Sequence, residues 1–499
     1  MCPVSSLAKI RPRIWFTLPL LAGGALLFLP KMLVVMGVAA GVTTVLVIAL
    51  TLFFAGSVLH GHVDLFVLSW LLIFPLGYYF LTFPHERSVF TLDRALVGLL
   101  IAALIFAPSP REKFLTKTMG KAALAWSLFL AAAFVSLRKM ENPLGASKNV
   151  LDPFVSPALL AYYVIRHFRL RQWLPTIHIL TCLMACYVAV IAGVELMTGE
   201  DLLPLPNATF FVEETGNLMR VNGPFGTNCS LAIIGMLTLW FVVFLGRALA
   251  DRLTGWRRLL HQIGIASAFA AAMMPMFRSI AITLVLVLLI EVAFNRQLHG
   301  RLIILSFLLL GVVGFLELPK IAPEFFEARV SDPSDLYGRI AQQQQTFDLF
   351  LRYPVNGVGL GNYMDTALAF PSHSYHGADS VGSPHNTLGS ILAETGLTGF
   401  IPFLVAQVYF FRAFWKLRRL RNPDTLLATT FFLYVFLTYW INGVMLTSGY
   451  YSDLNYWYLF VSAVLYKFAI TEPLTEASRV RPRAFARARS GVQLEGMAS

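Results

Sequence analysis

Long apolar segments recur along this chain from one end to the other. Each holds about 17–25 mostly apolar residues, enough for a helix to cross a hydrocarbon core of roughly 30 Å. Composition agrees, because 57% of the residues are hydrophobic and only 13% are charged, whereas soluble domains have about 25% charged residues. The fold class is therefore expected to be an all-α polytopic membrane protein with about 12–14 transmembrane helices. The predicted spans lie near residues 14–29, 32–56, 63–83, 92–107, 121–137, 150–165, 174–197, 228–246, 260–277, 279–294, 302–318, 397–415, 424–443 and 453–470.

The basic residues indicate how these helices are oriented in the membrane. If the amino terminus faces the cytoplasm, about two thirds of the 39 lysine and arginine residues fall on cytoplasmic segments, as the positive-inside rule requires. We predict that both termini face the cytoplasm. The formal net charge of +12 then reflects topology. Because these charges are dispersed over loops without a binding domain, they argue against a nucleic-acid partner, and membrane lipids are the expected contacts.

A polar stretch over residues 319–396 interrupts the apolar pattern. Connections between helices are usually short, so a long polar connection is expected to carry function. It also divides the chain. We predict a transmembrane bundle with short loops over residues 1–318, including an outer loop at 198–227, then the large outer loop 319–396, carboxyl-terminal transmembrane helices over 397–470, and a disordered basic cytoplasmic tail over 471–499.

Two short helices are predicted within the large outer loop. Residues 334–352 place Ile340, Phe347 and Leu351 at roughly helical spacing, which indicates an amphipathic helix on the membrane or on the bundle. Alternatively, this helix is a lid that takes no part in a reaction.

The second helix is expected to start with Ser383 as the N-cap, Pro384 at the first helical position and His385 in the first turn, and to stop at Gly396. The positive end of the helix dipole disfavours an imidazolium, so His385 is expected to be neutral, as a general base requires. A histidine that only hydrogen-bonds a neighbouring loop remains an alternative.

Three glycines follow the first of these helices at alternate positions, Gly357, Gly359 and Gly361. They do not follow a predicted strand and do not have the GxGxxG order, so the sequence does not indicate a dinucleotide or P-loop site. A tight turn is predicted instead. Its glycines permit either close backbone packing or the presentation of amide groups to an anion.

The predicted outer side, where positive charge is sparse, holds Arg220, Arg278, Arg329, Arg339 and Arg352. Each one alone is explained as an interface anchor whose guanidinium reaches the headgroup region. Several arginines converging around one loop would instead form an anion site, because guanidinium groups bind phosphate through paired hydrogen bonds and remain charged. Both interpretations stay open on this evidence.

Neither of two candidate metal sites is supported by its sequence pattern. Cys182 and Cys186 lie four residues apart in an apolar span without a partnering histidine, which is typical of small buried hydrophobic residues. A zinc site made of His373, His376 and His385 has no reinforcing cysteine or HExxH pattern. We expect no metal and no other cofactor.

The polar motifs follow one another in a characteristic order between about Arg220 and Gly399. They are Arg278 at a helix end, the large outer loop with Gly338-Arg339, Pro354-Val355-Asn356-Gly357-Val358-Gly359-Leu360-Gly361-Asn362, His385-Asn386, and Glu394-Thr395-Gly396-Leu397-Thr398-Gly399. In this order the chain resembles the bacterial O-antigen ligase and polymerase superfamily. Two details differ from the family: the helix-end arginine, usually within Ser-Arg-Gly, here reads Phe277-Arg278-Ser279, and Gly389 interrupts the helix after the histidine motif.

The resemblance implies a metal-independent, inverting glycosyltransferase with a GT-C-like membrane fold in the bacterial inner membrane. Its donor would be a glycan on undecaprenyl pyrophosphate, presented at the periplasmic face, and its acceptor a lipid A-core sugar or another lipid-linked repeat. Other polysaccharide-assembly proteins would be further partners. Arg278 and Arg339, together with Arg220, would bind the pyrophosphate, and His385 would orient or deprotonate the acceptor hydroxyl. Asn386 and the three alternate glycines would support the loop.

A transporter, such as a polysaccharide flippase, is the alternative from another functional class. Transporters of this size place ionisable residues near the middle of the membrane. The predicted spans here are nearly free of such residues, and Glu195 and Glu291 fall near predicted helix ends. The charge pattern therefore favours the enzyme.

Overall fold

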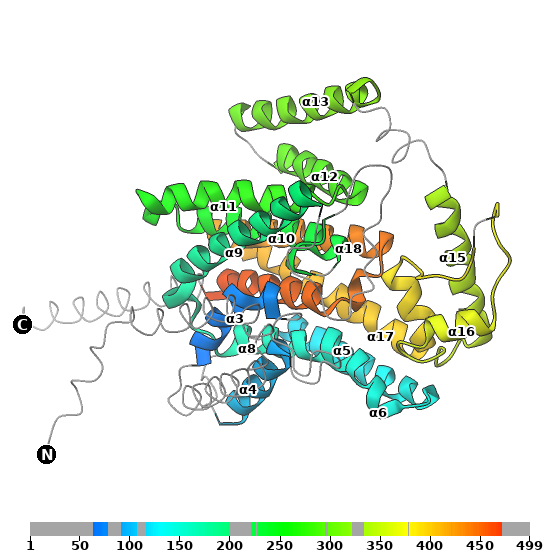
Figure 1. The fold of residues 1–499 in the computed structure, drawn as a ribbon. Coiled ribbons are helices and arrows are strands. Elements are labelled where there is room, and N and C mark those ends of the chain that lie inside the picture. Colours follow the sequence, from blue (N-terminus) through cyan, green and yellow to red (C-terminus); the bar gives the residue numbers. More distant parts are fainter. Residues whose placement is uncertain are drawn as a thin grey trace, which may run out of the picture.

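The computed structural model describes residues 63–77, 91–106, 116–199, 221–225, 227–294, 298–321, 334–377, 379–420 and 422–471. Over these residues the chain forms helices and no β-strand (Figure 1). The main helices are α3 (Val63–Gly77), α4 (Leu92–Phe106), α5 (Lys117–Ser136), α6 (Pro143–Ala146), α7 (Lys148–Val150), α8 (Ser156–Arg166), α9 (Leu170–Thr198), α10 (Asn228–Ala248), α11 (Trp256–Met273), α12 (Arg278–Phe294), α13 (Leu298–Ile321), α15 (Ser334–Arg352), α16 (Tyr363–Ala369), α17 (Thr387–Leu417) and α18 (Pro423–Met445), followed by helical residues 452–471.

The predicted spans agree with these helices. Every predicted span from 63–83 onward overlaps a helix, and the first two, 14–29 and 32–56, lie outside the described residues. Among the described residues, five helices are long and apolar enough to cross a membrane, judged by length and composition. They comprise Lys117–Lys139, Leu170–Thr198, Asn228–Ala248, Thr387–Leu420 and Pro423–Met445. The chain is an all-α polytopic membrane protein, as its sequence predicts.

Helix α10 lies inside the bundle, with α9, α11 and α18 around it (Figure 1). Nearly all of its apolar stretch is buried. Aromatic rings from distant parts of the chain meet in the same core: Phe74 of α3 stacks on Trp457 with ring centroids 5.5 Å apart, and Phe241 of α10 meets Trp457 edge-on. In a lipid surrounding, such close packing and van der Waals contact hold helices together, because burial from water contributes little there.

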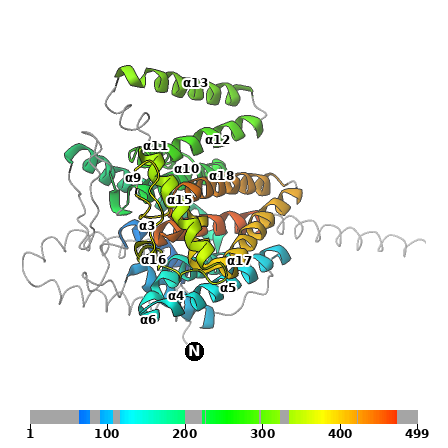
Figure 2. The same cartoon turned by 90° about the vertical axis from the view of Figure 1, so that its right-hand side faces the viewer.

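The helices of the predicted large loop gather at one end of the bundle. Figure 1 shows α15 and α16 beside the start of α17, and Figure 2 views that end with α15 crossing in front. Helices α12 and α13 lie at the periphery of the bundle in both views. The loop helices are thus packed onto the end of the membrane helices.

The glycine turn after α15 packs directly on α17. Gly357, Gly359 and Gly361 have φ values of 63°, 109° and 83°, a region that glycine adopts without steric cost. The amides of Val358 and Gly359 donate to the carbonyls of Ala393 and Glu394, both at 2.9 Å. A Cβ on Gly357 would lie 2.2 Å from the backbone carbon of Glu394. The turn is therefore a close backbone contact, and these two amides are bonded within the protein.

Helix α17 is kinked where this turn meets it. Gly396, the predicted helix stop, has φ 59° and ψ −165° and separates two helical segments. The amide of Leu397 donates to the carbonyl of Pro354 at 2.9 Å, and that of Thr398 to the carbonyl of Val355 at 3.1 Å. The glycine turn thus supplies the hydrogen bonds that the interrupted helix lacks.

Candidate functional site

A pocket of about 690 Å³ lies where α15 meets the start of α17 and the end of α18. It brings together Arg339 and His385, which are far apart in the sequence. Asn386 also lines it. The remaining lining residues are Leu336, Ile340, Gln343, Gln344, Phe347, Asp348, Val444 and Met445.

Helix α15 presents Arg339 to the pocket through one of its faces. Its bounds, Ser334–Arg352, are those predicted from sequence. Arg339, Gln343 and Phe347 recur at four-residue intervals and so share a face. All three line the pocket, which makes this face the wall opposite His385.

The buried side of α15 is partly polar, because Gln345 is buried there beside Leu349. Phe347 and Leu351 from the predicted apolar face are 56% and 58% exposed, whereas Gln345 is fully buried. The Gln345 side chain donates to the carbonyl of Phe370 at 2.9 Å and accepts from the amide of Ser372. Because both ends of the amide group are bonded, its burial costs little. The exposed Phe347 side chain lies beside the pocket.

The side chain of Tyr363 on α16 contacts α15. Its hydroxyl lies 2.9 Å from that of Thr346 on α15. Burial raises the pKa of Tyr363 to about 12, so the phenol stays protonated at neutral pH and keeps a hydrogen to donate. This contact holds α15 against α16.

His385 lies just outside α17, and the predicted start of this helix is wrong. The N-cap is Asn386, whose side-chain oxygen accepts from the amides of Leu388 and Gly389 at 3.0 and 3.2 Å. Helix α17 begins at Thr387, so Pro384 and His385 precede it. The hydroxyl of Ser383, the predicted N-cap, lies 3.3 Å from that of Thr447 instead. Asparagine and serine are equally good N-cap residues. Because the Ser383 hydroxyl contacts Thr447, Asn386 caps the helix instead.

The backbone of His385 has φ 44°, a left-handed conformation that side chains larger than glycine rarely adopt. Such strain persists only where the surroundings impose it, and it concentrates at functional sites. Here the contacts on either side of the residue impose it.

A single side chain, that of Gln343, holds both neighbours of His385. Its amide nitrogen donates to the carbonyl of Pro384 at 2.7 Å, and its oxygen accepts from the side chain of Asn386 at 3.3 Å. Gln343 stands one helical turn after Arg339, so the same bridge sets the spacing between the arginine and the histidine. The sequence analysis did not single out this residue; its only local signal was the four-residue spacing from Arg339.

Arg278 does not line this pocket but begins α12 at the same end of the bundle. Helices α12 and α18 run antiparallel, with the Asn442 side chain donating to Thr283 at 3.3 Å and the Tyr434 hydroxyl to Glu291. The same register places Arg278, at the start of α12, near the carboxyl-terminal end of α18. Its side chain is exposed. Arg220 lies outside the described residues.

The charges of the pocket are mixed. Asp348 lines it together with Arg339, and its carboxylate accepts a hydrogen bond of 2.5 Å from the hydroxyl of Ser372. This bond engages one carboxylate oxygen of Asp348 with the segment that carries Ser372. His373 and His376 are exposed and do not line the pocket; His376 stacks on Tyr337 at 4.7 Å instead.

The histidines of the loop do not gather into a metal-binding cluster. Within the described ranges, the group of side chains spaced to hold a metal ion is His178, Cys182 and His261. The interpretation of Cys182 as a cysteine without a histidine partner is therefore wrong. His178 precedes it by one turn on α9, a spacing visible in the sequence, whereas His261 is brought in from α11 by tertiary packing.

Residues 263–404 match the family model described as O-antigen ligase. The match runs from α11 to α17 and contains Arg278, Arg339 and His385. A comparison with curated proteins gave no match. The matched segment confirms the resemblance predicted from the order of the motifs: residues 263–404 are similar to the O-antigen ligase family.

Proposed function

We propose that this protein is a glycosyltransferase of the O-antigen ligase or polymerase type. It would move a glycan from undecaprenyl pyrophosphate to a sugar hydroxyl of lipid A-core or of another lipid-linked repeat. The family match supports a ligase- or polymerase-like role in polysaccharide assembly. The observation that carries the proposal is the pocket that Arg339 and His385 line together.

The two residues have complementary roles in the proposed reaction. The imidazole of His385 accepts the proton of the acceptor hydroxyl as its oxygen bonds to the anomeric carbon, with inversion. The bond from that carbon to the pyrophosphate oxygen breaks, and negative charge grows on the leaving group. Arg339 faces that charge with a fixed guanidinium, which stabilises it without a metal ion. Arg278, and Arg220 in the outer loop, are further candidates to bind the pyrophosphate.

The apolar part of the pocket suits an amphiphilic donor. Leu336, Ile340, Phe347, Val444 and Met445 line it beside the polar residues, and most of these side chains are more than 40% exposed. A polyprenyl chain attached to the pyrophosphate would cover them. A soluble sugar nucleotide would leave this wall exposed.

The proposed location is the bacterial inner membrane, with both termini in the cytoplasm and the loop 319–396 at the periplasmic face. Single cysteines introduced at Ser372 and Arg418 test this orientation in a variant without native cysteines. A membrane-impermeant maleimide should label the first from the periplasm and spare the second. Labelling only at position 418 would put the pocket in the wrong compartment.

The function is tested with purified protein in proteoliposomes. Supplied with an undecaprenyl-pyrophosphate-linked glycan and an acceptor, it should release undecaprenyl pyrophosphate and extend the acceptor without ATP, ion gradient or added metal. Two acceptors, lipid A-core and a second lipid-linked repeat, distinguish ligase from polymerase. Movement of the intact donor between leaflets without glycan transfer would support the flippase instead.

A further inference from the structure

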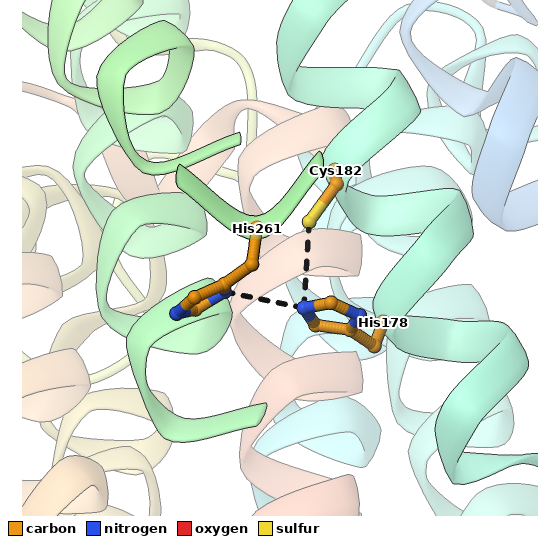
Figure 3. A group of neighbouring side chains, drawn as sticks. All are labelled: His178, Cys182 and His261. Atoms are coloured by element: carbon orange, nitrogen blue, oxygen red, sulfur yellow. Dashed lines mark hydrogen bonds between the residues drawn. The ribbon is translucent and has the colours of Figure 1, made fainter. Parts of the chain in front are cut away.

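A second group of polar side chains lies between α9 and α11, away from the Arg339–His385 pocket. His178 and Cys182 stand one turn apart on α9, and His261 reaches them from α11 (Figure 3). His178 is 1% exposed and Cys182 is fully buried. Ionisable side chains inside membrane-spanning helices are costly and commonly mark a functional site.

The three side chains converge as ligands of one ion do. Nε2 of His178 lies 3.2 Å from Nδ1 of His261 and 3.7 Å from Sγ of Cys182. The three donor atoms all lie within 4.8 Å of one another. Around a single ion with bonds of about 2.0 Å to nitrogen and 2.3 Å to sulfur, neighbouring donors are separated by roughly 3.2–3.8 Å. Small side-chain shifts would close this set on an ion.

Two glycines provide the space for these side chains. A Cβ on Gly246 of α10 would lie 2.2 Å from Cε1 of His261, and one on Gly264 of α11 would lie 2.7 Å from Sγ of Cys182. Any larger residue at either position would displace a member of the cluster. Helices α9, α10 and α11 thus approach one another at points that leave room for the imidazole and the thiol.

We propose that His178, Cys182 and His261 bind one monovalent copper ion. A cysteine thiolate and two neutral imidazoles around Cu⁺ give a site with no net charge, whereas Zn²⁺ would leave one positive charge beside two buried ligands and the partly buried His261. The cluster contains no carboxylate to balance that charge. Arg257, one turn before His261, adds positive charge near His178. Soft thiolate and imidazole donors also suit Cu⁺.

The bound ion would join α9 to the helix that ends shortly before Arg278. Helix α11 runs from Trp256 to Met273, and His261 lies in its second turn. At about 1.5 Å per residue, the cluster is roughly 18 Å from the far end of α11. The ion would therefore be a clamp between helices, distant from the proposed chemistry.

Copper content measures the proposal directly. Full-length protein in detergent is loaded with Cu⁺ under a reductant, freed of excess metal and analysed by elemental mass spectrometry. Wild type should retain one copper per chain, and its copper K-edge absorption spectrum should show one sulfur and two nitrogen neighbours. Failure of the folded wild type to retain copper overturns the proposal, whatever the variants do.

Variants assign the ligands. Cys182→Ser and His261→Asn should weaken copper binding by more than roughly 100-fold in a bathocuproine competition, since outer partners of metal ligands alone contribute about 10–100-fold. Cys186→Ser is the matched control: it lies one turn further along α9, where its sulfur accepts from Ser267, and should bind copper as wild type does. Equal copper retention by wild type and Cys182→Ser would overturn the assignment. So would a preference of wild type for Zn²⁺ when both ions are offered.

Discussion

Helix α10 lies inside the bundle and α15 lies at its end, and the two use their side chains differently. In α10 the apolar residues are buried, including Ile233 and Leu237 with no exposed surface. In α15, Phe347 and Leu351 are exposed, whereas Gln345 is buried beside Leu349 and hydrogen-bonded at both ends. Positions in α10 therefore act through packing, and positions around α15 act through polar contacts with the pocket. Substitutions should separate stability from activity along the same division.

The largest effect is expected at His385. His385→Ala should reduce glycan transfer by about 10²–10⁴-fold, the usual loss when a general base is removed, while leaving thermal unfolding and donor binding nearly unchanged. Initial rates in donor-saturated proteoliposomes provide the measurement. His376→Ala, also a histidine with positive φ, is the control and should stay active. Full turnover of His385→Ala would assign this histidine a supporting role and move the base elsewhere.

Arg339→Lys should have the next largest effect. Lysine keeps the charge but loses the paired hydrogen bonds of the guanidinium. A loss of about 2–4 kcal/mol of transition-state stabilisation corresponds to roughly 30- to 1000-fold in rate. The rate is compared with that of Arg352→Lys on the same helix, which is outside the pocket lining. Unimpaired Arg339→Lys and Arg278→Ala together would be incompatible with arginines binding the pyrophosphate.

Gln343→Ala sharpens the comparison, because Gln343 hydrogen-bonds both neighbours of His385. Leaving the carbonyl of Pro384 without its donor costs about 1–3 kcal/mol, or roughly 5- to 150-fold in kcat if the histidine shifts. The adjacent Gln344 lines the same pocket and is exposed, so Gln344→Ala is the control. A positioning role further requires that the Gln343→Ala rate defect vanish when His385 is already absent. Additive losses in the double variant would contradict it.

The smallest effect belongs to the core. Ile233→Val in α10 should lower stability by about 0.5–1.5 kcal/mol through loss of one buried methylene and leave kcat unchanged. Leu351→Ala on the exposed side of α15 should stay within about 0.5 kcal/mol of wild type. Thermal unfolding in detergent compares the two. A larger loss of stability in Leu351→Ala would mean that the exposed side of α15 packs against another part of the protein.

The sequence predicted those features that depend on local length and polarity. The spans followed from runs of apolar residues, and the bounds of α15 followed from the helical spacing of its apolar residues. The start of α17 could not be settled locally, because Ser383 and Asn386 are both good caps and the contact of Ser383 with Thr447 decides between them. The buried face of α15 depends on Phe370 and Ser372, which lie outside the helix.

The site was predicted only in part, because some of its residues acquire their roles through tertiary contacts. Arg339 and His385 stood out by residue type, and the structure brings them to one pocket. Gln343 has no distinguishing type and acquires its role only when Pro384 and Asn386 fold onto α15. Similarly, His178 and Cys182 are readable as a pair on one helix, but His261 follows 83 residues after His178 and joins them only through helix packing.

The kink at Gly396 has a mechanical consequence. The segment of α17 that carries Asn386 is braced by the glycine turn and by Gln343. The helix is interrupted at Gly396, and the first residues after it, Leu397 and Thr398, bond to Pro354 and Val355. Membrane helices tilt to match the thickness of the lipid bilayer. A joint at this point would let the later part of α17 tilt without rotating His385 away from Arg339. Turnover should therefore vary little between proteoliposomes made from short-chain and long-chain lipids, and a strong dependence on acyl length would mean that the joint is rigid.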